Sequence, residues 1–150
     1  MADIEVQETV KAAPTVLYGM VSDLPRMGEW SPENTGGKWL GGATGPSAGA
    51  KFRGTNRNGL LFWMTTVTVT AADAPQRFTF DVDVMGVPIS TWDYTFVDGP
   101  DGCVVTESWT DRRPRWMQVS SVVTGVRDRT THNRRNMQET LARLKAAAES

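Results

Sequence analysis

The feature that most limits the possible folds is a change of hydrophobic period near residue 113. Between residues 60 and 111, apolar and polar side chains alternate in successive short runs, most clearly over residues 77–84. After Arg113-Pro114, apolar residues recur every three or four positions from Val119 to Ala148. Alternation is typical of half-buried strands, and the longer period is typical of an amphipathic helix. The sequence therefore predicts a run of strands followed by one long helix over residues 127–149.

The remaining elements follow from turn signals and short periodic runs. Alternation over residues 4–10 predicts a first strand, and the pattern after Ala13-Pro14 predicts a short helix, followed by a second over residues 24–30. Eight glycines lie between residues 36 and 59, where we expect a hairpin with strands over residues 38–40 and 51–56. Four further strands follow over residues 60–71, 77–84, 91–96 and 103–111. Hairpin connections imply antiparallel pairing, so the prediction is an α+β fold: a curved antiparallel sheet of about seven strands around the C-terminal helix.

Length and composition limit the number of domains and the cellular location expected for this chain. The 150 residues suit a single domain, expected over residues 1–150. The longest apolar run is residues 60–64, so no membrane span is predicted. Residues 1–12 show no secretory signal, and the only cysteine, Cys103, offers no disulfide partner, so we expect a cytoplasmic protein. Its oligomeric state, monomer or homodimer, stays open.

Charge is distributed unevenly along the chain. Residues 1–111 carry seven basic and fourteen acidic side chains, whereas residues 112–150 carry nine basic and three acidic ones. A basic end can bind nucleic acid, but these basic residues have only Trp116 as an interleaved aromatic. The favoured interpretation is a solvated helix face balanced by an acidic sheet, and no nucleic-acid partner is expected.

Several segments together resemble a known superfamily. They are Ala13-Pro14, residues 21–24 leading to Glu29-Trp30-Ser31-Pro32-Glu33, and residues 49–54, 104–109 and 140–145. In this order they resemble the Bet v 1-like or START-like (SRPBCC) superfamily, and within it the small bacterial proteins of polyketide cyclase/dehydrase type. The resemblance implies a helix-grip fold with an apolar cavity between sheet and helix. It also implies binding of a small hydrophobic ligand, which only some members convert chemically.

Alternation assigns many aromatic residues to the inward face of the sheet. Aromatic walls bury a large area, and their polar atoms can orient a ligand, but the same pattern also fits a filled core. The residues alone leave both open, and the resemblance favours a cavity. The candidate ligand-binding residues are Trp30, Phe52, Trp63, Thr65, Phe80, Trp92, Tyr94, Glu107, Trp109, Asn133 and Met137.

Two inward carboxylates invite separate interpretations. Glu107 lies between Val105 and Trp109 on its face, and Glu8 lies between Val6 and Val10. One hypothesis makes Glu107 or Tyr94 a proton carrier in an aromatase/cyclase or dehydratase reaction. The other pairs the carboxylates with Arg53, Arg77 or Asn133, or places them at the cavity rim.

The sequence lacks the residue patterns of catalytic triads, metal sites and phosphate-binding loops. His132 is the only histidine and is expected on the helix surface, so a catalytic triad is not predicted. Asp81 and Asp83 have no His or Cys at ligand spacing, and no metal is expected. The glycines form no phosphate-binding motif, and no cofactor is expected. The leading hypothesis is binding of a lipid-, aromatic- or polyketide-like molecule in an internal cavity.

Overall fold

The computed structural model describes residues 2–118 and 129–150. Its seven strands form one sheet in the order β1-β7-β6-β5-β4-β3-β2, and every neighbouring pair is antiparallel. The elements are β1 (Ile4–Val10), α1 (Pro14–Ser22), η1 (Leu24–Glu29), β2 (Asn34–Trp39), β3 (Lys51–Asn58), β4 (Leu61–Asp73), β5 (Arg77–Val84), β6 (Val87–Gly99), β7 (Gly102–Asp111), α2 (Arg115–Gln118) and α3 (Arg129–Glu149). This is the predicted α+β fold.

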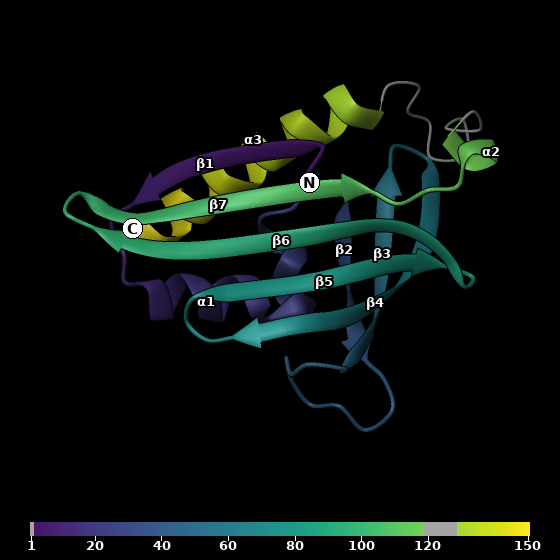
Figure 1. The fold of residues 1–150 in the computed structure, drawn as a ribbon, viewed down its shortest axis with the longest axis horizontal. Coiled ribbons are helices and arrows are strands. Elements are labelled where there is room, and N and C mark those ends of the chain that lie inside the picture. The colour runs from purple at the N-terminus through teal and green to yellow at the C-terminus, as the bar shows by residue number, and fades with distance from the viewer. Residues whose placement is uncertain (1, 119–128) are drawn as a thin grey trace.

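The sheet is strongly curved, and α1 and α3 lie on one side of it. In Figure 1, β2 and β3 run steeply across the direction of β5, β6 and β7, while α1 and α3 lie behind the sheet. The pairing shifts at three points: on β2 between Asn34 and Gly36, between β4 and β5 near Thr70, and between β5 and β6 near Asp83. Such irregularities bend a strand and increase its twist. The curvature gives the sheet a concave face toward α3 and a convex face away from it.

The long helix closes the concave side with one apolar stripe. Met137, Leu141 and Leu144 are each at most 1% exposed, and Asn133 and Thr140 are buried beside them. Their spacing of three and four residues places them on one helix face, as the sequence pattern predicts. The helix is described from Arg129, so residues 127–128 of the predicted helix, and the apolar pattern from Val119 to Val126, lie outside the described residues.

Two strands differ clearly from their predictions. The strand expected over residues 91–96 is β6, which is longer at both ends and covers Val87–Gly99. The strand expected over residues 38–40 is β2, which begins at Asn34 and ends at Trp39. The start of β2 could not be predicted from the sequence, because Gly36 and Gly37 have no side chains to show an alternation of apolar and polar residues. Gly37 has a φ of 150°, and a Cβ there would lie 2.0 Å from the carbonyl oxygen of Arg53. The close approach of β3 therefore requires glycine at this position.

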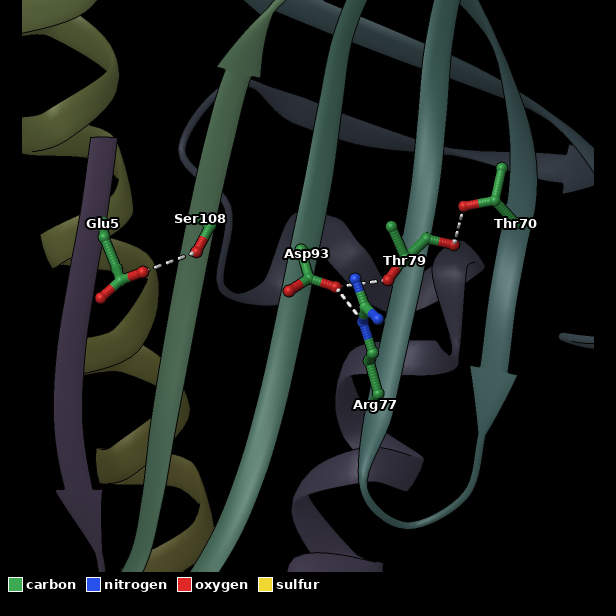
Figure 2. Close-up of polar contacts among 6 residues, drawn as sticks. All are labelled: Glu5, Thr70, Arg77, Thr79, Asp93 and Ser108. Atoms are coloured by element: carbon green, nitrogen blue, oxygen red, sulfur yellow. Dashed lines mark hydrogen bonds and ion pairs between the residues drawn. The ribbon is translucent and has the colours of Figure 1, made fainter. Parts of the chain in front are cut away.

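The convex face carries a band of polar side chains. Arg77 Nε donates a hydrogen bond to Asp93 Oδ1 at 2.8 Å, and the Thr79 hydroxyl donates to the same oxygen. Ser108 on β7 donates to Glu5 on β1 at 3.4 Å. Figure 2 shows these side chains in front of the sheet, with α3 behind it. The convex face thus holds its carboxylates among donors and solvent.

No helix within residues 2–118 and 129–150 is long and apolar enough to cross a membrane.

Candidate functional site

A cavity of about 270 Å³ lies between the concave face of the sheet and α3. Strands β3 to β7 supply most of its wall, and η1, α3 and the residues around the start of β2 supply the rest. The wall is predominantly apolar and aromatic, with polar groups at intervals, as is usual for small-molecule sites. The described lining residues are Met27, Ser31, Glu33, Asn34, Asn56, Trp63, Thr65, Val67, Phe80, Val82, Val84, Ile89, Ser90, Trp92, Tyr94, Glu107, Trp109, Arg113, Asn133, Asn136, Met137 and Thr140.

Most of the candidate residues chosen from the sequence meet at this cavity. Those lining it are Trp63, Thr65, Phe80, Trp92, Tyr94, Glu107, Trp109, Asn133 and Met137. They come from four strands and one helix, and β-strand alternation directs the strand residues to the same face.

Phe52 and Trp30 do not line the cavity. Phe52 is 1% exposed and packs edge-to-face on Trp39, with ring centroids 5.2 Å apart. Trp30 is 2% exposed, and the Arg26 guanidinium lies 5.3 Å from its ring centroid. Both were expected to contact a ligand; instead, both belong to the solid core beside the cavity.

A buried hydrogen bond joins two of the cavity residues. The Tyr94 hydroxyl on β6 donates to Glu107 Oε2 on β7 at 2.5 Å. The two residues are direct partners in the antiparallel register, so their side chains leave the same face side by side. Glu107 Oε1 has no hydrogen-bond partner among the described residues. Phe80 stacks against the Tyr94 ring at 6.5 Å and helps to fix its position.

Burial dominates the electrostatics of this pair. Glu107 is 1% exposed, and burial raises the pKa of its carboxyl to about 8, although the hydrogen bond from Tyr94 acts in the opposite direction. Burial and the adjacent Glu107 carboxyl raise the pKa of the Tyr94 hydroxyl well above its usual value. At neutral pH Glu107 is therefore mostly an uncharged acid, and Tyr94 is an uncharged donor.

The alternative pairing of Glu107 with an arginine is not what the structure shows. Arg77 projects from the convex face and binds Asp93, and Arg53 is exposed on β3. Glu8 is half-buried on β1 opposite Val105 and is not among the described cavity-lining residues. Glu107 is thus the inward carboxylate that reaches the cavity from β7.

Charged groups that line the cavity are paired. Arg113 donates to both oxygens of Asp111, at 2.9 and 2.7 Å. Burial alone would raise the pKa of Asp111, but its hydrogen bonds from the Arg113 side chain and backbone outweigh burial and lower the pKa. His132 Nε2 lies 3.2 Å from Glu33 Oε2 and so links α3 to the segment before β2.

Sequence reasoning missed several polar lining residues. Ser90 and Thr140 are buried at the cavity, and Glu33 and Asn34 reach it from the segment before β2 and from its first residue. Thr140 lies three residues after Met137 and four before Leu144, so the helical spacing could have predicted that it faces the cavity. Nothing in the sequence links Glu33 to His132, which lies 99 residues away.

Among the described residues, no group of three or more His, Cys, Asp or Glu is placed to hold a metal ion.

A curved antiparallel sheet gripping a C-terminal helix, with a cavity between them, defines a helix-grip protein. A family model described as polyketide cyclase / dehydrase and lipid transport matches residues 1–149. The chain belongs to this family. A search of curated proteins found no significant match.

Solved structures agree with this fold. The Polyketide_cyc-like protein Cgl2372 from Corynebacterium glutamicum is 26% identical, with a TM-score of 0.64 over 95% of this chain and 88% of that one. The di-domain ARO/CYC BexL from the BE-7585A biosynthetic pathway is 16% identical, with a TM-score of 0.73 over 98% of this chain. This chain spans half the length of that di-domain protein. Protein CV1439 from Chromobacterium violaceum is 12% identical, with a TM-score of 0.74 over 100% of this chain and 99% of that one.

Proposed function

We propose that residues 1–150 form one ligand-binding unit that holds a small, largely apolar molecule between the sheet and α3. The observation that carries this proposal is the cavity of about 270 Å³ with Trp63, Trp92 and Trp109 in its wall. Protein interiors are normally packed with few voids larger than a water molecule, so a hollow of this size needs an occupant or a use. The membership in a family described as including lipid transport supports the same function.

A binding measurement tests the proposal directly. Native mass spectrometry of freshly purified protein should find a retained small molecule. A fluorescent dye that responds to apolar surroundings should bind saturably and receive energy from the cavity tryptophans. Exposed Trp116 lies outside the described cavity lining, so Trp116→Phe is a matched control that should leave dye binding unchanged. No retained molecule and no saturable dye binding would contradict the proposal.

A second function, an aromatase/cyclase or dehydratase reaction, is favoured by one further observation. The Glu107 carboxyl has a pKa of about 8, so its acid and base forms both exist near neutral pH, as a proton-transfer group requires. Glu107→Gln separates the two functions. A binding protein keeps its affinity, whereas a proton-transfer catalyst loses turnover by roughly 10²–10⁴-fold.

A further inference from the structure

The buried carboxyl group of Glu107 in the cavity wall has only one of its two oxygens hydrogen-bonded within the described part of the chain. Tyr94 satisfies Glu107 Oε2 at 2.5 Å, whereas Oε1 of the same buried carboxyl has no described partner. Buried polar atoms in native proteins are nearly always hydrogen-bonded, and an unsatisfied one is costly. Because Glu107 lines the cavity, a molecule inside it is in a position to supply the missing partner.

Burial of Glu107 and the direction of its hydrogen bond together indicate what kind of partner is missing. Burial raises the pKa of Glu107, so its carboxyl is mostly uncharged at neutral pH and carries one hydrogen. Tyr94 donates to Oε2, so Oε2 acts as the carbonyl oxygen of the neutral acid and the acidic hydrogen belongs on Oε1. Glu107 therefore presents a donor at Oε1, and its partner must be an acceptor.

The charges around Glu107 are consistent with a neutral acid. Besides Tyr94 and Glu107, the titratable groups among the described lining residues are Glu33 and Arg113. Glu33 lies beside His132 on α3, and Arg113 is bound by Asp111. On β1, the half-buried Glu8 lies on the same inward face of the sheet, and it is an acidic group. Burial is the main cause of the raised Glu107 pKa, and the hydrogen bond from Tyr94 only partly opposes it.

We propose that the ligand is an uncharged molecule with a carbonyl-type oxygen that accepts a hydrogen bond from Glu107 Oε1, with Tyr94 positioning the acid. This inference rests on the proposed function and adds the chemical class of the ligand. Among the described residues, Arg113 is the cation that lines the cavity, and Asp111 already binds its guanidinium, so these residues offer an anionic ligand no unpaired cation. An ammonium ligand would lose its hydration in an apolar cavity, and an ion pair with a single carboxylate would not compensate for that loss.

Three size-matched probes test this class: benzophenone, diphenylmethane and aminodiphenylmethane, titrated by calorimetry between pH 6 and 10. Benzophenone should bind about fivefold more tightly than diphenylmethane at pH 6, the usual gain from one added hydrogen bond. This preference should fade as the pH rises through about 8, where Glu107 loses its proton. Diphenylmethane affinity should change little over the same range.

Two substitutions locate the effect. In Glu107→Gln the amide oxygen accepts from Tyr94 and the amide N–H takes the place of Oε1–H, so the ketone preference should remain and its pH dependence should disappear. Glu107→Leu should abolish the preference. Glu8→Gln removes a carboxylate outside the described cavity lining and should behave as the parent.

The outcomes are distinguishable. Equal binding of benzophenone and diphenylmethane by the parent would overturn the carbonyl assignment and leave the proposed function standing. Tightest binding of aminodiphenylmethane, lost in Glu107→Gln, would also overturn it and identify a cationic ligand. Failure of all three probes to bind would contradict the proposed function itself. Because the Gln variant is isosteric, the test does not depend on the folding of Glu107→Leu.

Discussion

On the convex face of β6, Asp93 accepts hydrogen bonds from Arg77 and Thr79, whereas Glu107 on the concave face of β7 accepts one from Tyr94. Tyr94 directly follows Asp93 in the sequence, and the two side chains leave opposite faces of the same strand. The Arg77 side chain is 53% exposed and that of Asp93 is 23% exposed, but Glu107 is 1% exposed. One face therefore surrounds a carboxylate with a cation and water, and the other surrounds it with aromatic rings.

The comparison teaches that the face of the sheet, and not the residue type, decides what a carboxyl group does here. Asp93 has a guanidinium and a hydroxyl as partners, while the apolar wall around Glu107 favours the uncharged acid. The concave face is itself divided, because Phe78 lies in solid packing and Trp92 lies beside the hollow. Four substitutions test these contrasts, in order of decreasing expected effect.

Replacing Phe78 with alanine should cause the largest loss of stability. Phe78 is 0% exposed, and its ring lies 6.1 Å from Tyr18 and 5.7 Å from Phe80. The free energy of unfolding, measured by denaturant titration, should fall by about 3–5 kcal/mol because the variant creates a cavity in filled core. Val97→Ala, at a 62% exposed site, should change it by less than about 0.5 kcal/mol. A loss below about 1 kcal/mol for Phe78→Ala would mean that the hollow extends to this part of the core.

Glu107→Gln should change how stability depends on pH. Between pH 4.5 and about 8, the unfolded chain has released the Glu107 proton and the folded protein retains it. The free energy of unfolding of the parent therefore loses about 1.4 kcal/mol per pH unit from this group, and the loss ends above the folded pKa. In denaturant titrations, the free energy of unfolding of the Gln variant should therefore increase relative to that of the parent as the pH rises across this range. Parallel curves for the two proteins would show that Glu107 has an ordinary pKa.

Trp92→Ala should cost less than Phe78→Ala although it removes a larger ring. Trp92 is half-buried and borders the cavity, so its removal enlarges an existing hollow. We expect a loss below about 3 kcal/mol, together with a measurable change in the affinity of an apolar dye. A larger loss with no dye binding to the parent would indicate a filled core at this position.

Asp93→Asn on the convex face should have the smallest effect. The Asn side chain still accepts from Thr79 but loses its ion pair with Arg77, so stability should change by no more than about 1 kcal/mol. The difference should shrink at high salt because the Arg77 side chain is exposed. A large effect that persists at high salt would place Asp93 in an environment as dry as that of Glu107.

Strand alternation predicted most of the cavity wall because it is a local property. Trp63, Phe80, Trp92 and Trp109 were assigned to the inward face by period two, and each borders the cavity. Phe52 was assigned inward by the same rule and is buried, yet it packs on Trp39 away from the hollow. Alternation gives the face of a residue but not the place along that face where the hollow lies.

The sequence by itself determined the order of the elements, the long C-terminal helix and the inward direction of Glu107, since each depends on residues a few positions apart. The tertiary structure alone decided that Tyr94 on β6 bonds Glu107 on the neighbouring strand β7, that Phe52 packs away from the cavity, and that space remains between sheet and helix. These features depend on strand register, on sheet curvature and on the distance between packed surfaces. Curvature and that distance arise only when the whole sheet closes around α3.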